Sequence, residues 1–362
     1  MKKIAFALAA VLLLTLCLTG CGGKEALTLN VYNWGEYISD GSEGSFDTVR
    51  EFEKWYQETY NQKVTVNYTT FASNEDMYNK ISSGAVSYDV IIPSDYMIAR
   101  MAGEGLLQTL NFDNIPNYQY IDDNFKGLYY DAENQYSVPY TYGIVGVIYD
   151  GNVVDAADAN GWDLLWNEKY SNRILQFNNS RDAFGTAMYK LGIDVNTTDK
   201  AEWDRAYDEL LGQRPLVYSY VMDEIFNMME SGEAAVGAYY AGDYFTMKDA
   251  QADNVDLQFY YPEKTNFYVD AMCIPKGCEN QENAEAFINF MCSTEAGLAN
   301  CEATGYSTPL LSVQEALPDE VKNDPVAYPD AEALGRCESF ANLPEDTLAL
   351  YDSEWLRLKT GG

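Results

Sequence analysis

The sequence predicts an α/β protein with two domains, and three observations support this. Predicted strands alternate with predicted helices over residues 27–103, and a second alternating block begins near residue 144. The chain has 362 residues, which is long enough to bury two hydrophobic cores. Because strands that alternate with helices form parallel or mixed sheets, we expect helices on both faces of each sheet.

The first 20 residues have the pattern of an export signal. Lys2 and Lys3 precede an apolar run over residues 4–18, which is short for a membrane span. The run ends in Leu-Thr-Gly-Cys, which resembles the bacterial lipobox; the alternative is a secretory signal with an incidental cysteine. We therefore predict a signal peptide over residues 1–20, a lipid on Cys21 and a spacer over 21–26, which would anchor the protein outside the cytoplasm.

The first domain begins with a strand in which Leu27, Leu29 and Val31 alternate with polar residues. Ser73 and Asp76 have the spacing of a capping box. The further elements expected here are a helix at 46–60, a strand at 64–68, a helix after Ser73, a strand at 88–92, a helix at 97–103 and loops over 110–135.

The second domain follows an extended stretch over residues 138–143, which is flanked by Pro and Gly and suits a crossover between domains. Later, a strand at 267–274 is expected to return to the first domain, and residues 305–309 to cross again. The other expected elements are strands at 144–149, 174–177, 234–240 and 255–260 and helices at 162–166, 182–191, 203–210, 222–229, 284–291, 294–303 and 345–358.

Charge and composition exclude several classes of function. The net charge of −33 repels nucleic acid and attracts cations, although acidity also serves solubility. The chain has no histidine and no CxxC pair, which argues against imidazole metal sites and against catalysis by Ser/His/Asp or Cys/His groups. We expect no metal and no cofactor. The redox state of the remaining cysteines stays open: Cys273, Cys278, Cys292, Cys301 and Cys337.

Acidic and aromatic residues recur directly after predicted strands. Since ligands of open α/β sheets bind at the carboxyl ends of strands, this placement predicts a shared cleft for a cation, with surface acids as the alternative. Several buried carboxylates facing one cleft would require a multiply charged ligand. These residues are Trp34, Glu36 and Tyr37; Ser94 and Tyr96; Asn179, Arg181 and Asp182; Tyr239, Tyr240 and Asp243; Tyr268 and Asp270; and Tyr306.

Over residues 29–361 the sequence resembles the substrate-binding components of spermidine/putrescine ABC importers. The segments that carry the resemblance include Tyr-Asn-Trp-Gly-Glu-Tyr at 32–37, Pro-Ser-Asp-Tyr at 93–96, Ala-Gly-Asp at 241–243 and Thr-Gly-Tyr-Ser-Thr-Pro at 304–309. The resemblance implies a two-lobed clamshell of the type II periplasmic-binding-protein class. Its lobes would comprise residues 27–139 with 268–306, and 140–267 with 307–362.

The resemblance also implies roles for individual residues. Trp34, Tyr37, Tyr240 and Tyr268 would pack on a polyamine, and three acids would bind its amines: Glu36, Asp182 and Asp270. Asp243 matches an acid that the putrescine-preferring branch uses. Hydroxyls would come from Ser94, Tyr96 and Tyr306. Asn179 replaces an aspartate, and Tyr240 and Tyr268 replace tryptophans of the spermidine branch, so the choice between spermidine and putrescine stays open.

We therefore predict a monomeric, non-enzymatic binding protein that delivers a polyamine to an ABC permease. Primary ammonium groups have three donors each, so a surplus of carboxylates favours a di- or triamine over choline. The alternatives are an extracellular glycosidase with a carboxylate pair, a binding protein for a sugar or peptide, and a structural lipoprotein.

Overall fold

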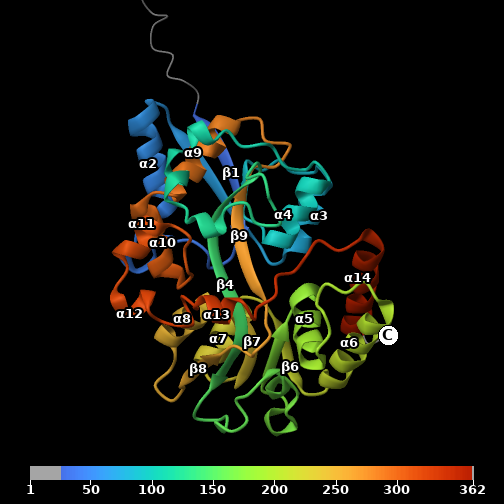
Figure 1. The fold of residues 1–362 in the computed structure, drawn as a ribbon. Helices are drawn as coiled ribbons and strands as arrows, with labels where there is room; N and C mark the ends of the chain where they lie inside the picture. Colours follow the sequence, from blue (N-terminus) through green and yellow to red (C-terminus); the bar gives the residue numbers. More distant parts are fainter. Residues whose placement is uncertain (1–25, 361–362) are drawn as a thin grey trace, which may run out of the picture.

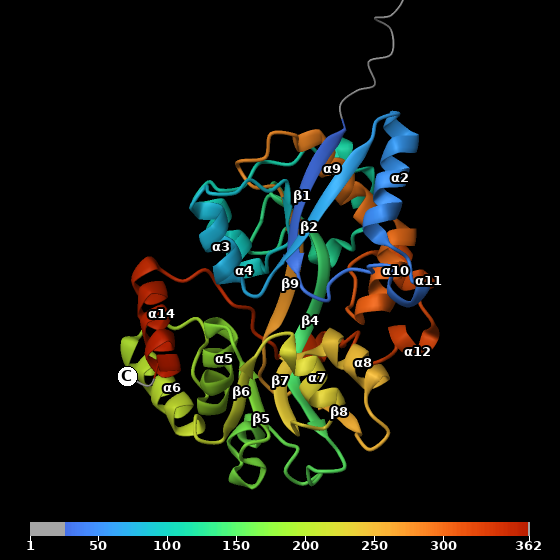
Figure 2. The same ribbon diagram turned by 180° about the vertical axis from the view of Figure 1, so that it is seen from behind.

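The computed structural model describes residues 26–360, which form two lobes of mixed α/β structure, as predicted (Figure 1). The predicted signal peptide and Cys21 lie outside the described residues. Within 26–360, no helix combines the length and apolar character that crossing a membrane requires. Figure 2 shows the same two lobes from behind, with α14 beside the lower lobe.

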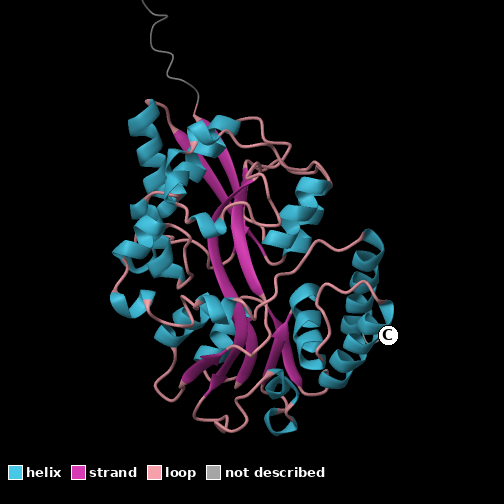
Figure 3. Cartoon of the chain, viewed as in Figure 1, coloured by secondary structure: helices cyan, strands magenta, loops and turns pink. Residues whose placement is uncertain are grey.

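A single nine-stranded sheet runs through both lobes (Figure 3), in the order β2-β1-β3-β9-β4-β7-β5-β6 with β8 paired to β4. The upper lobe joins parallel β1, β2 and β3 to β9 and the first half of β4, which are antiparallel. The strands are β1 (Leu27–Trp34), β2 (Val64–Phe71), β3 (Val90–Ile91), β4 (Ser137–Asp150), β5 (Ile174–Phe177), β6 (Val217–Val221), β7 (Val236–Tyr240), β8 (Leu257–Tyr260) and β9 (Phe267–Cys273).

Strand β4 belongs to both lobes. Its residues 137–144 pair with β9, whereas residues 145–150 pair with β7 and β8. Nearly all of β4 is buried, which agrees with an uninterrupted apolar strand covered on both faces. The stretch predicted to be a crossover is therefore the first half of a longer strand.

Helices cover both faces of the sheet, and several begin at a side-chain cap. Asp47 caps α2 by accepting from the backbone N–H of Arg50, and Ser73 caps α3 by accepting from Asp76 N–H, as the capping-box spacing predicted. The longer helices are α2 (Thr48–Tyr60), α3 (Asn74–Ser82), α4 (Asp95–Gly103), α5 (Ser180–Leu191), α6 (Lys200–Gln213), α7 (Glu224–Glu230), α8 (Ala241–Ala250), α9 (Gln281–Met291), α10 (Thr294–Thr304) and α14 (Glu345–Thr360).

Two elements that matter for the site were missed from the sequence. Strand β6 has the sequence Val-Tyr-Ser-Tyr-Val, which is typical of a strand although it has only five residues, and the prediction overlooked it. Helix α8 lies in the lower lobe, where it also contacts α10 of the upper lobe, and its first four residues are all buried. It therefore shows no polar face from which helical periodicity could be read.

The C-terminal part returns to the lower lobe late in the chain. Short helix α11 (Leu311–Ala316) packs on α10, and Leu310 pairs with Ile121 of the upper lobe. Helix α14 packs on α6, after α12 (Asp319–Lys322) and α13 (Ala331–Leu334). The lobe boundaries stay a prediction, and these contacts favour a last crossing near residues 335–344 instead of 305–309.

Candidate ligand-binding site

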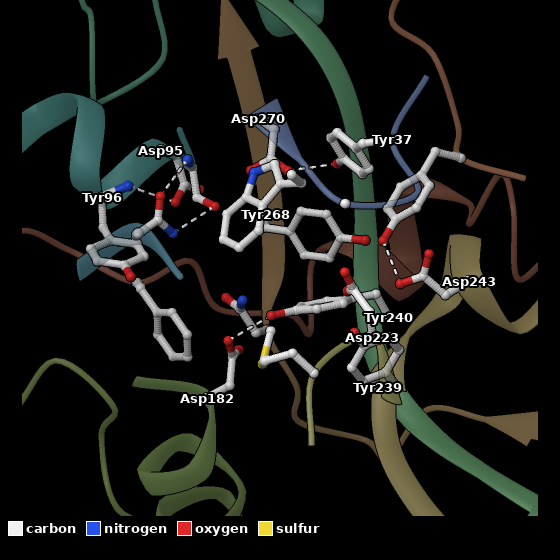
Figure 4. A pocket seen from close by; sticks show the side chains of 18 residues that line it. Tyr37, Asp95, Tyr96, Asp182, Asp223, Tyr239, Tyr240, Asp243, Tyr268 and Asp270 are labelled. Atoms are coloured by element: carbon white, nitrogen blue, oxygen red, sulfur yellow. Dashed lines mark hydrogen bonds between the residues drawn. The ribbon is translucent and has the colours of Figure 1, made fainter. Parts of the chain in front are cut away.

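A cavity lies between the two lobes (Figure 4). Its walls come from segments that follow β1, β3, β5, β6 and β7, and from β9, which matches the predicted gathering of strand ends. Of the twelve residues that the family resemblance singles out, ten line it: Trp34, Tyr37, Ser94, Tyr96, Asp182, Tyr240, Asp243, Tyr268, Asp270 and Tyr306.

Asp270 lies in β9 at the upper wall of the cavity and is 4% exposed. The Tyr37 hydroxyl, which also contacts Thr141 Oγ1 at 2.5 Å, donates to Asp270 Oδ2 at 2.6 Å. Asp270 Oδ1 has no hydrogen-bond partner among the described residues. Burial raises the pKa of Asp270 to about 6, because the hydrogen bond from Tyr37 offsets only part of the hydration that the carboxylate loses.

Asp182 lies in the first turn of α5, where the helix N-terminus favours a negative charge. Asn179 caps this helix: its Oδ1 accepts from Asp182 N–H, and its side-chain amide donates to Asp182 Oδ2, each at 2.8 Å. The Tyr240 hydroxyl donates to the same Oδ2 at 2.8 Å. Burial still raises the pKa of Asp182, because these contacts offset only part of the lost hydration.

Asp243 lies in the first turn of α8, on the other side of the cavity from Asp182 in Figure 4. The Tyr306 hydroxyl donates to its Oδ2 at 2.8 Å. Burial, together with neighbouring carboxylates, raises the pKa of Asp243 well above its ordinary value. The free cavity therefore holds a carboxyl group that favours protonation until a cation arrives.

Aromatic rings separate these carboxyl groups. Tyr240 and Tyr268 meet edge to face with centroids 5.3 Å apart, and Tyr37 meets Tyr306 in the same way at 4.6 Å. The hydroxyl of Tyr268 is buried and has no hydrogen-bond partner among the described residues. Rings at these positions can pack on methylene groups and on the ammonium groups between them.

Two predicted site residues lie outside the cavity lining. Glu36 is exposed and adopts a left-handed backbone conformation, with φ of 44°. Asn179 is buried behind Asp182 as the helix cap. A direct ligand contact by either residue therefore gains no support from its position.

Several lining residues were not predicted as site residues. Asp95 follows Ser94 after β3, and its Oδ2 has no hydrogen-bond partner among the described residues. Asp223 follows β6, a strand that was itself missed. Asp95 and Asp223 both lie just after a strand, so the placement that predicted the other site residues could have predicted them as well. Tyr239, which belonged to a predicted cluster but was given no role, also lines the cavity. The other unpredicted lining residues are Gly35, Asn74, Met222, Asn266 and Phe340.

The cavity has an unbalanced negative charge. Five aspartates line it, and no lysine or arginine does. None of the five takes part in an ion pair within the described residues. Their total charge is stable only when protons or a cationic ligand compensate it.

A cavity enclosed by two lobes that share continuous strands, and lined by aspartates and aromatic rings, is typical of a solute-binding protein. The chain belongs to the family of bacterial extracellular solute-binding proteins, whose profile matches residues 48–329. It is 32% identical, over the full length of both chains, to the spermidine/putrescine-binding periplasmic protein of Salmonella typhimurium.

Solved structures agree with this family. A protein from Listeria monocytogenes assigned to a spermidine/putrescine ABC transporter has a TM-score of 0.85 at 35% identity, covering 93% of this chain and 100% of its own. The spermidine/putrescine ABC transporter substrate-binding protein of Streptococcus pneumoniae has a TM-score of 0.73 at 34% identity, with 92% and 99% covered. The resemblance seen in the sequence motifs is thereby confirmed, and the glycosidase alternative has no support.

Proposed function

We propose that the protein captures a linear polyamine in the interlobe cavity and delivers it to the permease of an ABC importer. The observation that carries this proposal is the set of five aspartates that line the cavity without a cationic side chain among them. The names of the similar proteins, which refer to spermidine and putrescine, support the same ligand class.

The contacts of the cavity suit primary and secondary ammonium groups. Each such group donates two or three hydrogen bonds, and free acceptors are present at Asp270 Oδ1, Asp95 Oδ2 and Asn266 Oδ1. A quaternary ammonium would leave these acceptors unpaired, and a neutral sugar would leave the charge uncompensated. The rings of Tyr240 and Tyr268 would add roughly 0.5 to 2 kcal/mol for each cation–π contact.

Binding would couple to closure because both lobes contribute to the cavity. Asp182 and Asp243 come from the lower lobe, whereas Tyr37 and Ser94 come from the upper lobe. A ligand that contacts both lobes at once favours the closed arrangement over the open one. The permease could then distinguish loaded from empty protein by shape.

The anchoring is a separate proposal that concerns Cys21. A lipid on this residue would hold the binding protein at the membrane next to its permease. Expression of the full chain and a Cys21→Ser variant in a Gram-positive host, followed by fractionation, tests it. We expect the wild type in the membrane fraction and the variant in the medium; equal distribution would contradict the anchor.

Titration calorimetry of residues 26–362 with spermidine, putrescine, choline and a sugar panel tests the ligand class. We expect saturable binding of a polyamine only. Asp270→Asn should weaken it by roughly 2 to 5 kcal/mol, because a buried charge partner is removed. Asp208→Asn, which changes an exposed aspartate on α6, is the matched control and should bind as the wild type does. Binding of a sugar, or of no ligand, would overturn the proposal.

A further inference from the structure

A second cavity, the side cavity, lies between the lobes where α8 meets α10 and α12. Phe245 and Asp249 of α8 line it from the lower lobe, and Cys301 and Glu302 of α10 line it from the upper lobe. Helices α8 and α10 also contact each other, and Figure 1 and Figure 2 both place α12 beside them. The side cavity has a volume of about 420 Å³, which lies within the range of roughly 300 to 1,000 Å³ for small-molecule sites.

The wall of the side cavity is largely apolar. Leu317 and Ala327 are buried in it, and the Tyr328 hydroxyl is also buried, without a hydrogen-bond partner among the described residues. A wall of this kind packs on the hydrocarbon or aromatic part of a ligand, since that contact removes apolar surface from water. The apolar lining residues include Phe245, Tyr306, Leu317, Val321, Ala327 and Tyr328.

The side cavity is also acidic where it meets the solvent. Four carboxylates line it, and no lysine or arginine does. None of the four takes part in an ion pair within the described residues. An ammonium group at this edge therefore meets uncompensated negative charge, whereas a ligand carboxylate would be repelled. Three of these acids are exposed and the last is half-buried: Asp249, Glu302, Glu320 and Asp324.

Tyr306 connects the side cavity to the polyamine site, because it lines both cavities. Its hydroxyl donates to Asp243 at 2.8 Å in the polyamine site. The preceding residue, Gly305, lies against α8: a Cβ atom at position 305 would lie 2.6 Å from the Gly242 carbonyl oxygen. The two lobes are thus in close contact between the two cavities. A molecule in the side cavity would touch α8 on one lobe, and Tyr306 and α12 on the other.

We propose that the side cavity binds an amphipathic monoamine, an apolar group that carries one ammonium, and that this binding stabilises the present arrangement of the lobes. The apolar group packs against Leu317 and Ala327. The ammonium lies at the solvent edge, beside Glu302 and Glu320. A second ammonium would have to enter the apolar interior, which disfavours a polyamine here. Because a ligand in either cavity contacts both lobes, each ligand raises the affinity of the other, and this coupling is reciprocal. The side site is independent of the proposed function, whereas the coupling rests on it.

Calorimetry of residues 26–362 with 2-phenylethylamine tests the side site, with 2-phenylethanol and 3-phenylpropanoate as the neutral and anionic comparisons. The amine should bind at least about fivefold more tightly than either comparison, the upper end for one exposed ion pair. Val321→Trp, at an exposed lining position, should fill the cavity and abolish binding. Glu320→Gln should weaken the amine about three- to fivefold. Glu315→Gln, at an exposed acid of α11 outside the lining, is the matched control and should change it less than about twofold.

The coupling is measured by titrating spermidine with and without saturating 2-phenylethylamine. The monoamine should tighten spermidine binding at least about fivefold in the wild type, the lower end of typical coupling, and should have no such effect in Val321→Trp. Asp270→Asn should bind the monoamine as the wild type does, because Asp270 lines only the polyamine site.

The outcomes separate this inference from the proposed function. If the wild type does not bind 2-phenylethylamine, or binds all three probes equally, the side site is wrong although polyamine binding stands. The side site is also wrong if Asp270→Asn abolishes binding of the monoamine and Val321→Trp does not, because the probe then occupies the polyamine site. Unchanged spermidine affinity in the presence of bound monoamine would overturn the coupling. A protein that binds the monoamine but no polyamine would keep the side site and lose the proposed function.

Discussion

The hydroxyl of Tyr306 donates to Asp243 Oδ2 at 2.8 Å, and this bond joins the two lobes. Tyr306 follows α10 in the upper lobe, whereas Asp243 lies in the first turn of α8 in the lower lobe. Gly242 makes the approach possible, because a Cβ atom there would lie 2.5 Å from the Tyr306 ring. The approach of the two lobes at this point therefore depends on a glycine next to Asp243, the proposed ligand-binding acid.

Gly242→Ala should weaken polyamine binding without lowering the stability of the ligand-free protein. Alanine is favoured over glycine within a helix by up to roughly 1 kcal/mol, so the ligand-free protein should be no less stable. The added methyl group should hold the lobes apart and weaken polyamine binding at least about tenfold. Thermal unfolding and calorimetry measure the two effects. Gly212→Ala, at a helical glycine on α6 with open space around it, is the control; equal affinity of the two variants would contradict this role of Gly242.

Asn179 should act through Asp182. Asn179→Ala removes the cap of α5 and should destabilise the protein by about 1 kcal/mol, and it should also weaken the ligand because Asp182 loses its positioning partner. Asp199→Ala removes the cap of α6 and serves as the comparison. It should cost similar stability without changing affinity. If both variants bind equally well, Asn179 is a helix cap and nothing more.

The Tyr240 ring and its hydroxyl should contribute separately. Tyr240→Phe keeps the ring but removes the donor to Asp182, and Tyr240→Ala removes both. We expect a modest loss of affinity for Phe, and a further loss of roughly 0.5 to 2 kcal/mol for Ala as the cation–π contact disappears. Calorimetry with putrescine measures both steps. A Phe variant that binds as weakly as the Ala variant would show that the ring contributes nothing.

The sequence predicted the architecture and most of the cavity for one physical reason. Ligand-binding side chains of α/β proteins lie near the ends of strands. Strands with clear alternation or apolar runs could be recognised from the sequence, and so could the residues that follow them. Asp182 after β5, Asp243 after β7 and Asp270 within β9 were found in this way. The resemblance to a known family then added the pairing of the two lobes around one site.

The remaining differences also have physical causes. Asp223 was missed because β6, the strand that it follows, was not predicted, although its sequence Val-Tyr-Ser-Tyr-Val is typical of a strand. Glu36 was expected inside, yet its positive φ breaks the alternation after β1 and leaves the side chain exposed, while Tyr37 lines the cavity. Asn179 has the residue type of a ligand contact, but its spacing to Asp182 is equally that of a helix cap. Sequence spacing does not distinguish between these roles.

The buried carboxyl groups should make the free protein sensitive to pH. Burial raises the pKa of Asp270 to about 6 in the folded protein, compared with about 3.9 for an aspartate in an unfolded chain. The folded state therefore binds the proton more tightly, and the contribution of Asp270 to stability falls as pH rises from about 4 to about 6. The full loss for this group is about 3 kcal/mol.

A polyamine should reverse this trend, because an ammonium group beside Asp270 favours the ionised carboxylate. From pH 5 to pH 7.5 we expect the melting temperature of the free protein to fall, polyamine affinity to rise, and the ligand-induced shift in melting temperature to grow. Asp95 and Asp243, whose pKa values burial also raises, act in the same direction. In Asp270→Asn, the melting temperature and the polyamine affinity should each change less with pH, since one titrating group has been removed. Affinity that is constant between pH 5 and 7.5, or higher at pH 5, would mean that the ligand does not contact an ionised Asp270.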